Sequence, residues 1–430
     1  MSAVADRASP ALRRRWARIA VVAVVVLLGL LLLQAALRPE RVTRLLLNRV
    51  GQALGLDITA SGAGEYRVRG TPMLVVRDVV AREPGAATPV LRAERVLLSL
   101  PWSTIRSRGD DLVIQRIELD APRIDVAALQ HWLAARPPSE TKIPVLNDGL
   151  HIVRGRIDHP DWRIENLAVT MPSLHPDHAV AARVGGRFLA APTTIDFDLS
   201  LALSKPANGT GVGIAGPLTV EHGDWKLPAR IRLSGPLRID DGVVDVKPLR
   251  LAMSARYIAG TTNLPFAFAV KGPLHYQHST STYAPIGLAV RGQGAVPDFD
   301  ARGALAVGRR LVVRIAGRLA AWPDTWPALP TPIARSTSPL PFALDYAGKF
   351  DLSDVVALRL QRDQTRFDGR LRMPEMLAWI DAPPEGSPLP PLSGHLSTPK
   401  MEISGAQLEG VEVTLDDGED HAANSENAGK

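Results

Sequence analysis

The stretch IDFDLSLAL, from Ile195 to Leu203, alternates apolar residues with polar or small ones at every step. Successive side chains of a β-strand point to opposite faces, so this run predicts a strand with one apolar face. The side chains on that face belong to Ile195, Phe197, Leu199, Leu201 and Leu203. The same alternation recurs in two later runs, which contain Phe266, Phe268 and Val270, and Ile286, Leu288 and Val290.

Residues 148–415 show this period almost throughout, so we expect an elongated antiparallel sheet there. Glycines punctuate the alternating runs and are expected at turns. They include Gly155, Gly186, Gly292, Gly317 and Gly348. A Gly-Pro-Leu phrase also recurs, at Gly216, Gly235 and Gly272, with the spacing expected if it marked every second strand of a meander. Residues 416–430 are acidic, then small and polar, and predict a disordered tail.

The longest apolar run lies near the N-terminus, from Ile19 to Leu37 (IAVVAVVVLLGLLLLQAAL). At about 1.5 Å per residue, a helix of this length spans close to the ~30 Å hydrocarbon core of a bilayer. A cleaved signal peptide is the alternative, but its apolar core usually has only about 7–15 residues. We therefore expect a transmembrane helix at 19–37, a cytoplasmic arm at 1–18 and a periplasmic remainder.

The region after the apolar run predicts a short helix followed by strands. Apolar residues recur at helical spacing from Pro39 to Leu54, and the period changes to two from Asp57 onward. The strands are expected at Met73–Ala81, Val90–Leu100 and Leu112–Leu119. A second helix is expected at Val126–Arg136, ended by Pro137-Pro138, and a linker at 137–147.

Several phrases in this order are similar to the AsmA family of bacterial envelope proteins. The closest are LRAERV (Leu91–Val96), IELDAPRIDV (Ile117–Val126), the helix MPEMLAWI (Met373–Ile380) and the final stretch Pro391–Gly418. The resemblance covers both ends of the chain. The middle is similar only in its general strand-like residue pattern. It implies an AsmA-like module at 38–136 and an AsmA-like C-terminal end. Members of the family are thought to form apolar grooves, to be related to bridge-like lipid-transfer proteins, and to serve phospholipid movement toward the outer membrane.

Signatures of catalysis and metal binding are weak in this sequence. No G-x-S-x-G, Walker A or H-E-x-x-H motif is present. His175 and His178 are closely spaced, but no third ligand can be identified, and loop residues are the better interpretation. The absence of cysteine excludes a disulfide framework, and a formal charge of +6 over 430 residues is mild. We expect no enzyme activity, no catalytic or metal site, no cofactor and no nucleic-acid partner.

The alternating runs fit two architectures, since a sheet must bury its apolar face against something. One is a closed sandwich, and the other is a sheet curled into an open groove that holds acyl chains. Aromatic residues make up only 5% of the chain, and the apolar faces are rich in Val, Leu and Ile, which slightly favours a smooth groove. The resemblance also implies a groove. We therefore predict a mainly β protein: a transmembrane helix, then an elongated antiparallel sheet curled into a groove, with a few short capping helices.

Two functions follow from these architectures. The first is an inner-membrane-anchored periplasmic protein that binds or transfers phospholipid, or another acyl-chain ligand, and supports outer-membrane biogenesis. The second is a structural or assembly factor, whose closed β domain binds other envelope proteins. The candidate groove-lining residues are Ile195, Phe197, Leu199, Leu201, Leu203, Phe266, Phe268, Val270, Ile286, Leu288 and Val290.

Overall fold

The computed structural model describes a mainly β protein with two compact units, Met1–Ser173 and Leu174–Lys430. The residues described are 47, 51–52, 55–61, 64–67, 70–106, 113–135, 144–240, 242–326, 333, 336, 338–381, 391–403 and 406–416. The predicted transmembrane helix, the arm and nearly all of the predicted tail lie outside them. Within the described ranges, no helix has the length and apolar character needed to cross a bilayer.

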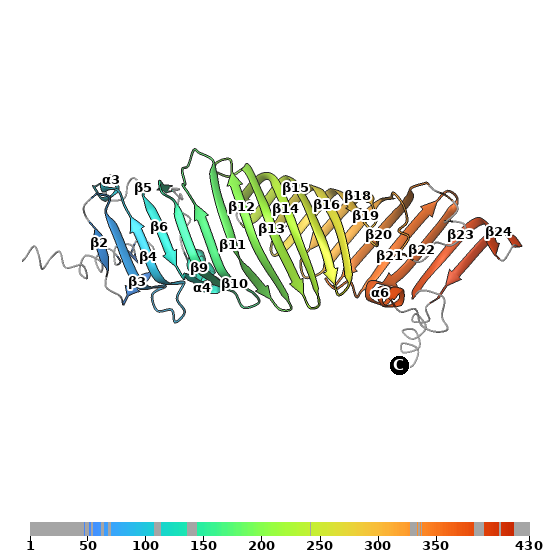
Figure 1. Ribbon diagram of the computed structural model, residues 1–430, viewed down its shortest axis with the longest axis horizontal. Helices are drawn as coiled ribbons and strands as arrows, with labels where there is room; N and C mark the ends of the chain where they lie inside the picture. Colours follow the sequence, from blue (N-terminus) through green and yellow to red (C-terminus); the bar gives the residue numbers. More distant parts are fainter. Residues whose placement is uncertain are drawn as a thin grey trace, which may run out of the picture. The chain divides into compact units, whose positions relative to one another are not determined.

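The first unit is a mixed sheet with short helices (Figure 1). Its strands are β1 (Asp57–Ala60), β2 (Glu65–Arg67), β3 (Met73–Arg82), β4 (Leu91–Ser99), β6 (Arg116–Asp120), β7 (Arg123–Asp125), β9 (Leu150–Asp158) and β10 (Arg163–Met171), with a separate pair β5 (Val113–Ile114) and β8 (Val145–Leu146). The helices are α3 (Trp102–Arg106) and α4 (Val126–Ala134). The predicted strands and the second predicted helix are thus confirmed. Of the first predicted helix, only Leu47, Gly51 and Gln52 are described, and they are helical.

Helix α4 makes the crossover that a parallel strand pair requires. It connects β6 and β7 to β9, and both of these strands pair with β9 in parallel. Asp125 caps the helix, because its side chain accepts a hydrogen bond of 2.8 Å from the backbone N–H of Ala128. Leu129 and Trp132 then pack against a buried cluster that includes Ala81 and Val90. The crossover brings β9 and β10, which follow the predicted linker, into the first unit.

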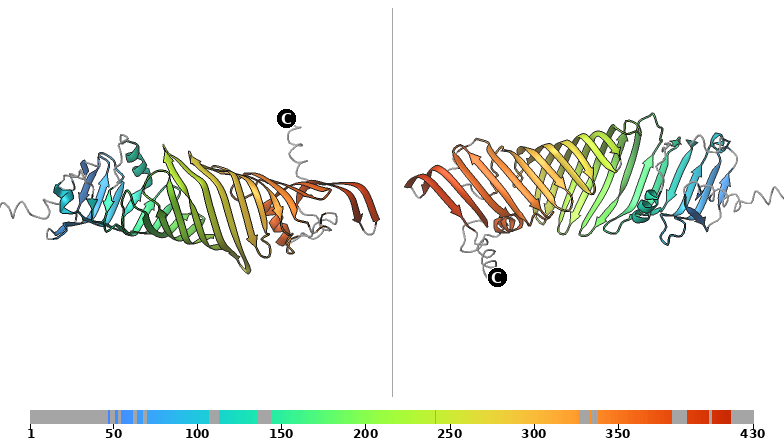
Figure 2. Two further views of the ribbon diagram at one scale, coloured as in Figure 1. Left: turned by 90° about the horizontal axis from the view of Figure 1, so that it is seen from above. Right: turned by 180° about the vertical axis from the view of Figure 1, so that it is seen from behind.

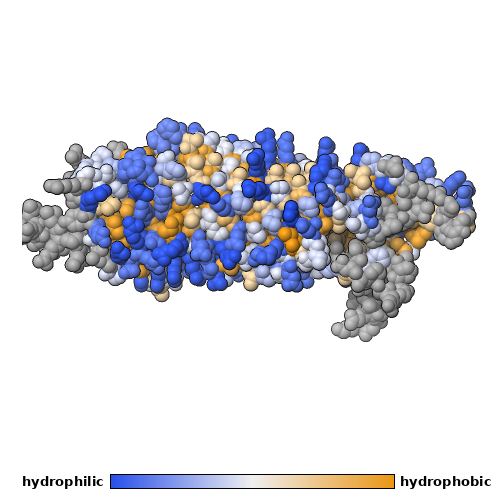
Figure 3. All heavy atoms as spheres, viewed as in Figure 1, coloured by the Kyte–Doolittle hydropathy of each residue, from blue (hydrophilic) through white to orange (hydrophobic). Residues whose placement is uncertain are grey.

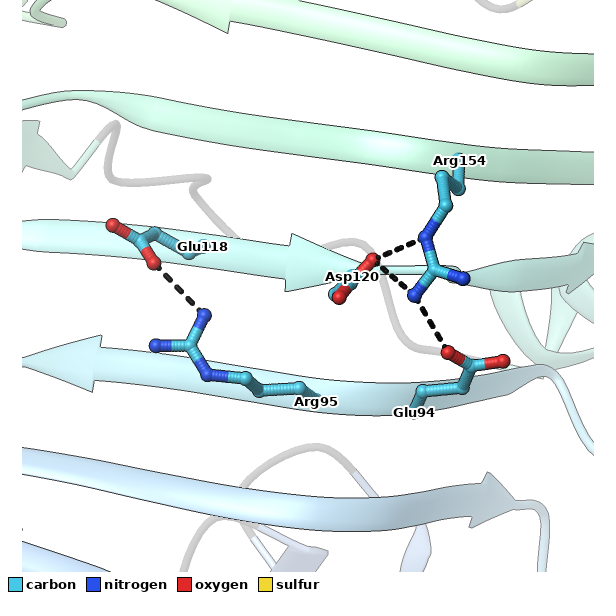
Figure 4. A network of polar contacts seen from close by, with 5 residues as sticks. All are labelled: Glu94, Arg95, Glu118, Asp120 and Arg154. Atoms are coloured by element: carbon cyan, nitrogen blue, oxygen red, sulfur yellow. Dashed lines mark hydrogen bonds and ion pairs between the residues drawn. The ribbon is translucent and has the colours of Figure 1, made fainter.

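Polar side chains tie the strands of the first unit together (Figure 4). Arg154 on β9 donates to Asp120 on β6 at 2.9 Å and to Glu94 on β4 at 2.7 Å. Arg95 on β4 donates to Glu118 on β6 at 3.0 Å. Such exposed and half-exposed ion pairs contribute only about 0–1 kcal/mol each to the stability of the fold. Their main effect here is on the register of the strands.

The second unit is an antiparallel meander, in which every strand pairs with the next one along the chain (Figures 1 and 2). Both figures show these strands as one curved sheet. The strands are β11 (Val180–Ala190), β12 (Thr193–Leu203), β13 (Thr210–His222), β14 (Trp225–Asp240), β15 (Val243–Ala259), β16 (Thr262–Gln277), β17 (Thr280–Gly292), β18 (Phe299–Val307), β19 (Leu311–Leu319), β20 (Leu340–Gly348), β21 (Val355–Arg362), β22 (Thr365–Arg372), β23 (Leu392–Ile403) and β24 (Ala406–Leu415). Helix α6 (Met373–Asp381) follows β22, where a helix was predicted.

Tight turns hold the register of the central hairpins. Two residues connect β13 to β14, β15 to β16, and β16 to β17. Each of these turns contains residues with positive φ, such as Gly223, Gly260, His278 and Ser279. Positive φ values match the twist that two-residue hairpins need. The strands of these three hairpins are therefore joined without any long connection.

The glycines expected at turns are mostly inside strands, and that prediction was wrong. Gly155, Gly186 and Gly317 lie within β9, β11 and β19, whereas Gly292 and Gly348 end β17 and β20. The close approach of neighbouring backbones explains one of them: a Cβ on Gly317 would overlap the carbonyl oxygen of Asp300 on β18. A strand glycine often marks such an approach rather than a turn.

The Gly-Pro-Leu phrases also lie inside strands, in β13, β14 and β16, rather than on every second strand. In β14 and β16 the phrase coincides with shifts of register that continue through β15 and β17. A proline stands at each shift, because proline cannot donate to the ladder. We call this line the proline seam, and its members are Pro236, Pro248, Pro273 and Pro285.

Candidate functional site

The predicted groove-lining runs share one face of the meander. Directly opposite residues of an antiparallel pair project to the same side, so the register identifies that face. Leu201 on β12 lies opposite Ile214 on β13, which lies opposite Leu233 on β14. Leu233 lies opposite Leu251 on β15, and Leu251 opposite Val270 on β16.

The same row continues to both edges of the second unit. Val270 lies opposite Leu288 on β17, and Leu201 lies opposite Ala182 on β11. Beyond β17 the row passes through Ala301, Gly317, Phe342, Leu360, Phe367, Leu396 and Val413. Not one member of the row is polar or charged. We call the side of the sheet that carries it the apolar face, and all eleven candidate residues project from it.

The apolar face is sheltered but not buried over β12–β17. Of the eleven candidates, only Ile286 is buried, at 5% exposure, and the other ten are half-buried. Positions on the opposite side, such as Arg250, Ala252 and Ser254, are exposed. The apolar face is therefore less exposed than the opposite side of the same strands. Figure 3 shows orange hydrophobic side chains at the surface between blue hydrophilic ones.

No second layer covers this part of the sheet among the described residues. Strands β12–β17 make extensive contacts only with their own ladder neighbours in that part of the chain. A closed sandwich would instead bury the large side chains of the apolar face completely. Contiguous apolar surface that no second layer covers usually marks a binding site.

The apolar face is closed further along, over β19–β23. A buried cluster there includes Leu340 and Leu360, and Ile333 from the connection between β19 and β20 packs into it with 1% exposure. The buried Arg362 secures that connection, since its guanidinium donates to the carbonyl oxygens of Ile333 at 2.8 Å and Ser336 at 2.7 Å. This connection is rich in proline, but proline content alone could not indicate that it packs onto the apolar face.

An aromatic cluster, which sequence reasoning did not single out, lies at one end of β12–β15. Trp225 stacks on His222 with ring centroids 5.4 Å apart, and lies 5.8 Å from the ring of Tyr257. His222 also shares a 2.8 Å hydrogen bond with the hydroxyl of Thr193. All four residues lie near hairpin turns, on strand positions that continue the apolar face. Rings with one apolar and one polar end suit the margin of an apolar surface. The sequence feature that could have identified this cluster is the presence of aromatic residues beside a hairpin turn.

The opposite side of the sheet, which we call the polar face, carries ion pairs. Arg183 on β11 donates two hydrogen bonds to Asp198 on β12, and Arg187 does the same for Asp196. These hydrogen bonds lower the pKa of both carboxyl groups below its ordinary value, although partial burial opposes the shift. The alternation of β12 therefore separates an apolar face from a charged one.

Two possible ligand motifs do not form sites. The rings of His175 and His178 lie 4.3 Å apart, and within the described ranges no three metal-ligating side chains gather. Residues 211–216 match G-x-G-x-x-G, a match that sequence reasoning missed. They are extended inside β13, so they cannot form the strand–turn–helix loop that binds a dinucleotide.

Comparison of this chain with protein-family models, with curated proteins and with solved structures gives no match.

Proposed function

We propose that the apolar face of β12–β17 binds the acyl chains of phospholipid. The protein would then be an inner-membrane-anchored periplasmic protein that binds or transfers phospholipid and supports outer-membrane biogenesis. The observation that carries the proposal is the uninterrupted apolar row from Ala182 to Val413, which is half-buried over β12–β17 and has no covering layer among the described residues. The proposal assigns no catalytic step to the chain.

The dimensions of the row suit a hydrocarbon chain. Neighbouring strands lie about 4.8 Å apart, so the five intervals from β12 to β17 span about 24 Å. One leaflet of a bilayer core is about 15 Å thick, half of the ~30 Å total. An extended acyl chain can thus lie along the row and stay in contact with Leu, Val and Phe side chains. Few polar groups are needed, because hydrophobic burial is non-directional.

The finer features of the architecture belong to the same proposal. The curved sheet would form a groove with the apolar face as its floor, and Trp225 and Tyr257 would stand at its margin. The apolar run at 19–37 would hold the chain at the inner membrane. The phrases similar to the AsmA family, at Leu91–Val96 and Ile117–Val126, agree with this assignment.

A structural or assembly factor is the competing function, and it would need the apolar face to be closed by protein. The half-buried state of Leu199 and its neighbours favours lipid, since protein-covered core side chains are normally buried completely.

Native mass spectrometry distinguishes the two functions. The domain that begins after Leu37 is purified without detergent and sprayed from a volatile buffer. We expect adducts with the masses of phospholipids, released on collisional activation. A lipid-free protein that copurifies with another envelope protein would support the assembly factor and contradict the proposal.

A further inference from the structure

A hollow on the polar face, across β14–β18, is lined by four cations. They are Arg232 on β14, Arg250 on β15, Lys271 on β16 and Arg302 on β18. All four side chains are exposed. Small residues form the floor between them, namely Ala252, Ala269, Gly287 and Ala289. No carboxylate is among the lining residues. We call these four cations the cationic patch.

The strand register places no carboxylate directly opposite any of these four cations. Arg250 lies directly opposite Lys271, an arrangement that is destabilising for like charges. Arg232 lies opposite Ala252, and Arg302 lies opposite Gly287. Within the described part of the chain, none of the four forms an ion pair or a side-chain hydrogen bond. A like-charged pair that no carboxylate relieves indicates an anion supplied from outside the chain.

Some other cations of the same face are neutralised in place, whereas Arg230 on β14 also has no ion pair among the described residues. Arg183 and Arg187 each hold an aspartate of β12. Arg291, next to the patch on β17, holds Asp300 of β18 with contacts of 2.8 Å and 3.0 Å. The nearest carboxylate on β18 is therefore already engaged.

We infer that the cationic patch docks the polar face onto the surface of an anionic lipid bilayer. Four strand intervals of about 4.8 Å separate β14 from β18, so the cations extend over about 19 Å. That distance exceeds the size of one phosphate and suits several phosphate groups in a plane. Guanidinium groups bind phosphate oxygens in a bidentate manner, and the small floor lets headgroups approach the sheet. The contact uses the side opposite the apolar face and does not require that face to hold lipid.

The chain has no cysteine, so one introduced thiol gives a unique reporter. Ser234 is exposed on β14 at the edge of the patch and lies opposite Arg250. The full chain with Ser234→Cys is labelled with a fluorophore and reconstituted with phosphatidylcholine vesicles, with or without phosphatidylglycerol. A quencher attached to lipid headgroups reports how close the label comes to the bilayer. A second chain, labelled at Thr414→Cys on the exposed end of the same face, serves as the positional control.

The charge variant is R232Q/R250Q/K271Q/R302Q. Its matched control, R92Q/R318Q/R366Q/R370Q, removes the same charge from other exposed strand positions. Circular dichroism melts of both variants verify that they fold. Each cation near an anionic surface contributes about fivefold to binding, so losing the patch is expected to weaken headgroup quenching at Ser234 by at least about tenfold.

We expect quenching at Ser234 only with phosphatidylglycerol, with loss in high salt and in the charge variant, and with little change in the matched control. Equal quenching on both kinds of vesicle would overturn the inference. So would quenching that the charge variant retains, or that is as strong at Thr414. Displacement by soluble polyphosphate far below the lipid phosphate concentration would assign the patch to a soluble polyanion instead. Phospholipid adducts in native mass spectra should persist in the charge variant, which separates this inference from the proposed function.

Discussion

Arg187 on β11 lies directly opposite Asp196 on β12 and donates two hydrogen bonds to its carboxylate, at 2.7 Å and 2.8 Å. The pair joins two neighbouring strands on the polar face, while Phe188 and Ile195, each one residue away, meet on the apolar face. One strand pair therefore shows how charge and hydrocarbon are kept on opposite sides of a single layer.

Removal of this pair should be visible in the titration of Asp196. The hydrogen bond from Arg187 is the main cause of its lowered pKa, so Arg187→Gln is expected to raise that pKa toward the ordinary value of about 4. A depressed folded-state pKa stabilises the fold above the unfolded pKa, and this contribution is lost as pH falls through the folded pKa. Carboxyl ¹³C NMR measures the shift. Asp198, which keeps Arg183, is the internal control and should not move.

A charge on the apolar face should block lipid without unfolding the protein. Leu199 is half-buried, so Leu199→Asp is expected to cost about 1–2 kcal/mol, rather than the several kcal/mol of an unpaired charge in a closed core. The melting temperature and the bound phospholipid are measured on the same sample. Ser200→Asp, on the polar face of the same strand, should leave both unchanged. A melted Leu199 variant would mean a closed core, and undiminished lipid would mean that β12 does not contact it.

The close approach of β18 and β19 predicts a sharp difference between two glycines. A Cβ on Gly303 would overlap the carbonyl oxygen of Arg314, so Gly303→Ala should destabilise the fold by roughly 1–3 kcal/mol. Gly213 on β13 has open space around the same position, and Gly213→Ala should be neutral or stabilising by up to about 1 kcal/mol. Thermal melts followed by circular dichroism compare them. Similar melting temperatures for the two variants would contradict the close approach.

Deletion of residues 1–37 is expected to leave a soluble, folded, strand-rich domain. Every later apolar run is short and alternates, so no second segment of the sequence suits a bilayer. Far-ultraviolet circular dichroism and sedimentation with membranes test this expectation. A helix-dominated spectrum, or a product that still pellets with membranes, would count against it.

The period of two was enough to predict the strands, because it reports directly on which side chains share a face. Ile195–Leu203, Phe266–Val270 and Ile286–Val290 all lie in strands. What the period could not indicate was that these three runs meet on one face. That depends on the register of every intervening hairpin, and thus on turn residues such as His278 and Ser279, whose positive φ is unusual for their type.

The predicted positions of the glycines and of the Gly-Pro-Leu phrases were wrong for a related reason. Pro236 and Pro248 stand inside long strands, which is tolerated because the neighbouring strands shift register at the same level. The sequence of a single strand does not show whether its neighbours shift register at the same level. Whether the apolar face is open also depends on distant parts of the chain, since Ile333 and Arg362 close it over β19–β23 and no described residue does so over β12–β17.

The pairing of β11–β24 only with sequence neighbours makes the second unit close to a one-dimensional array. In such an array each strand depends on two others, so local damage should spread only to adjacent hairpins. Insertion or removal of one hairpin would keep all other pairings and would return the next strand to the same direction and the same face. The distance that the apolar row covers can therefore change by duplication or loss of hairpins, while each residue along it keeps its neighbours.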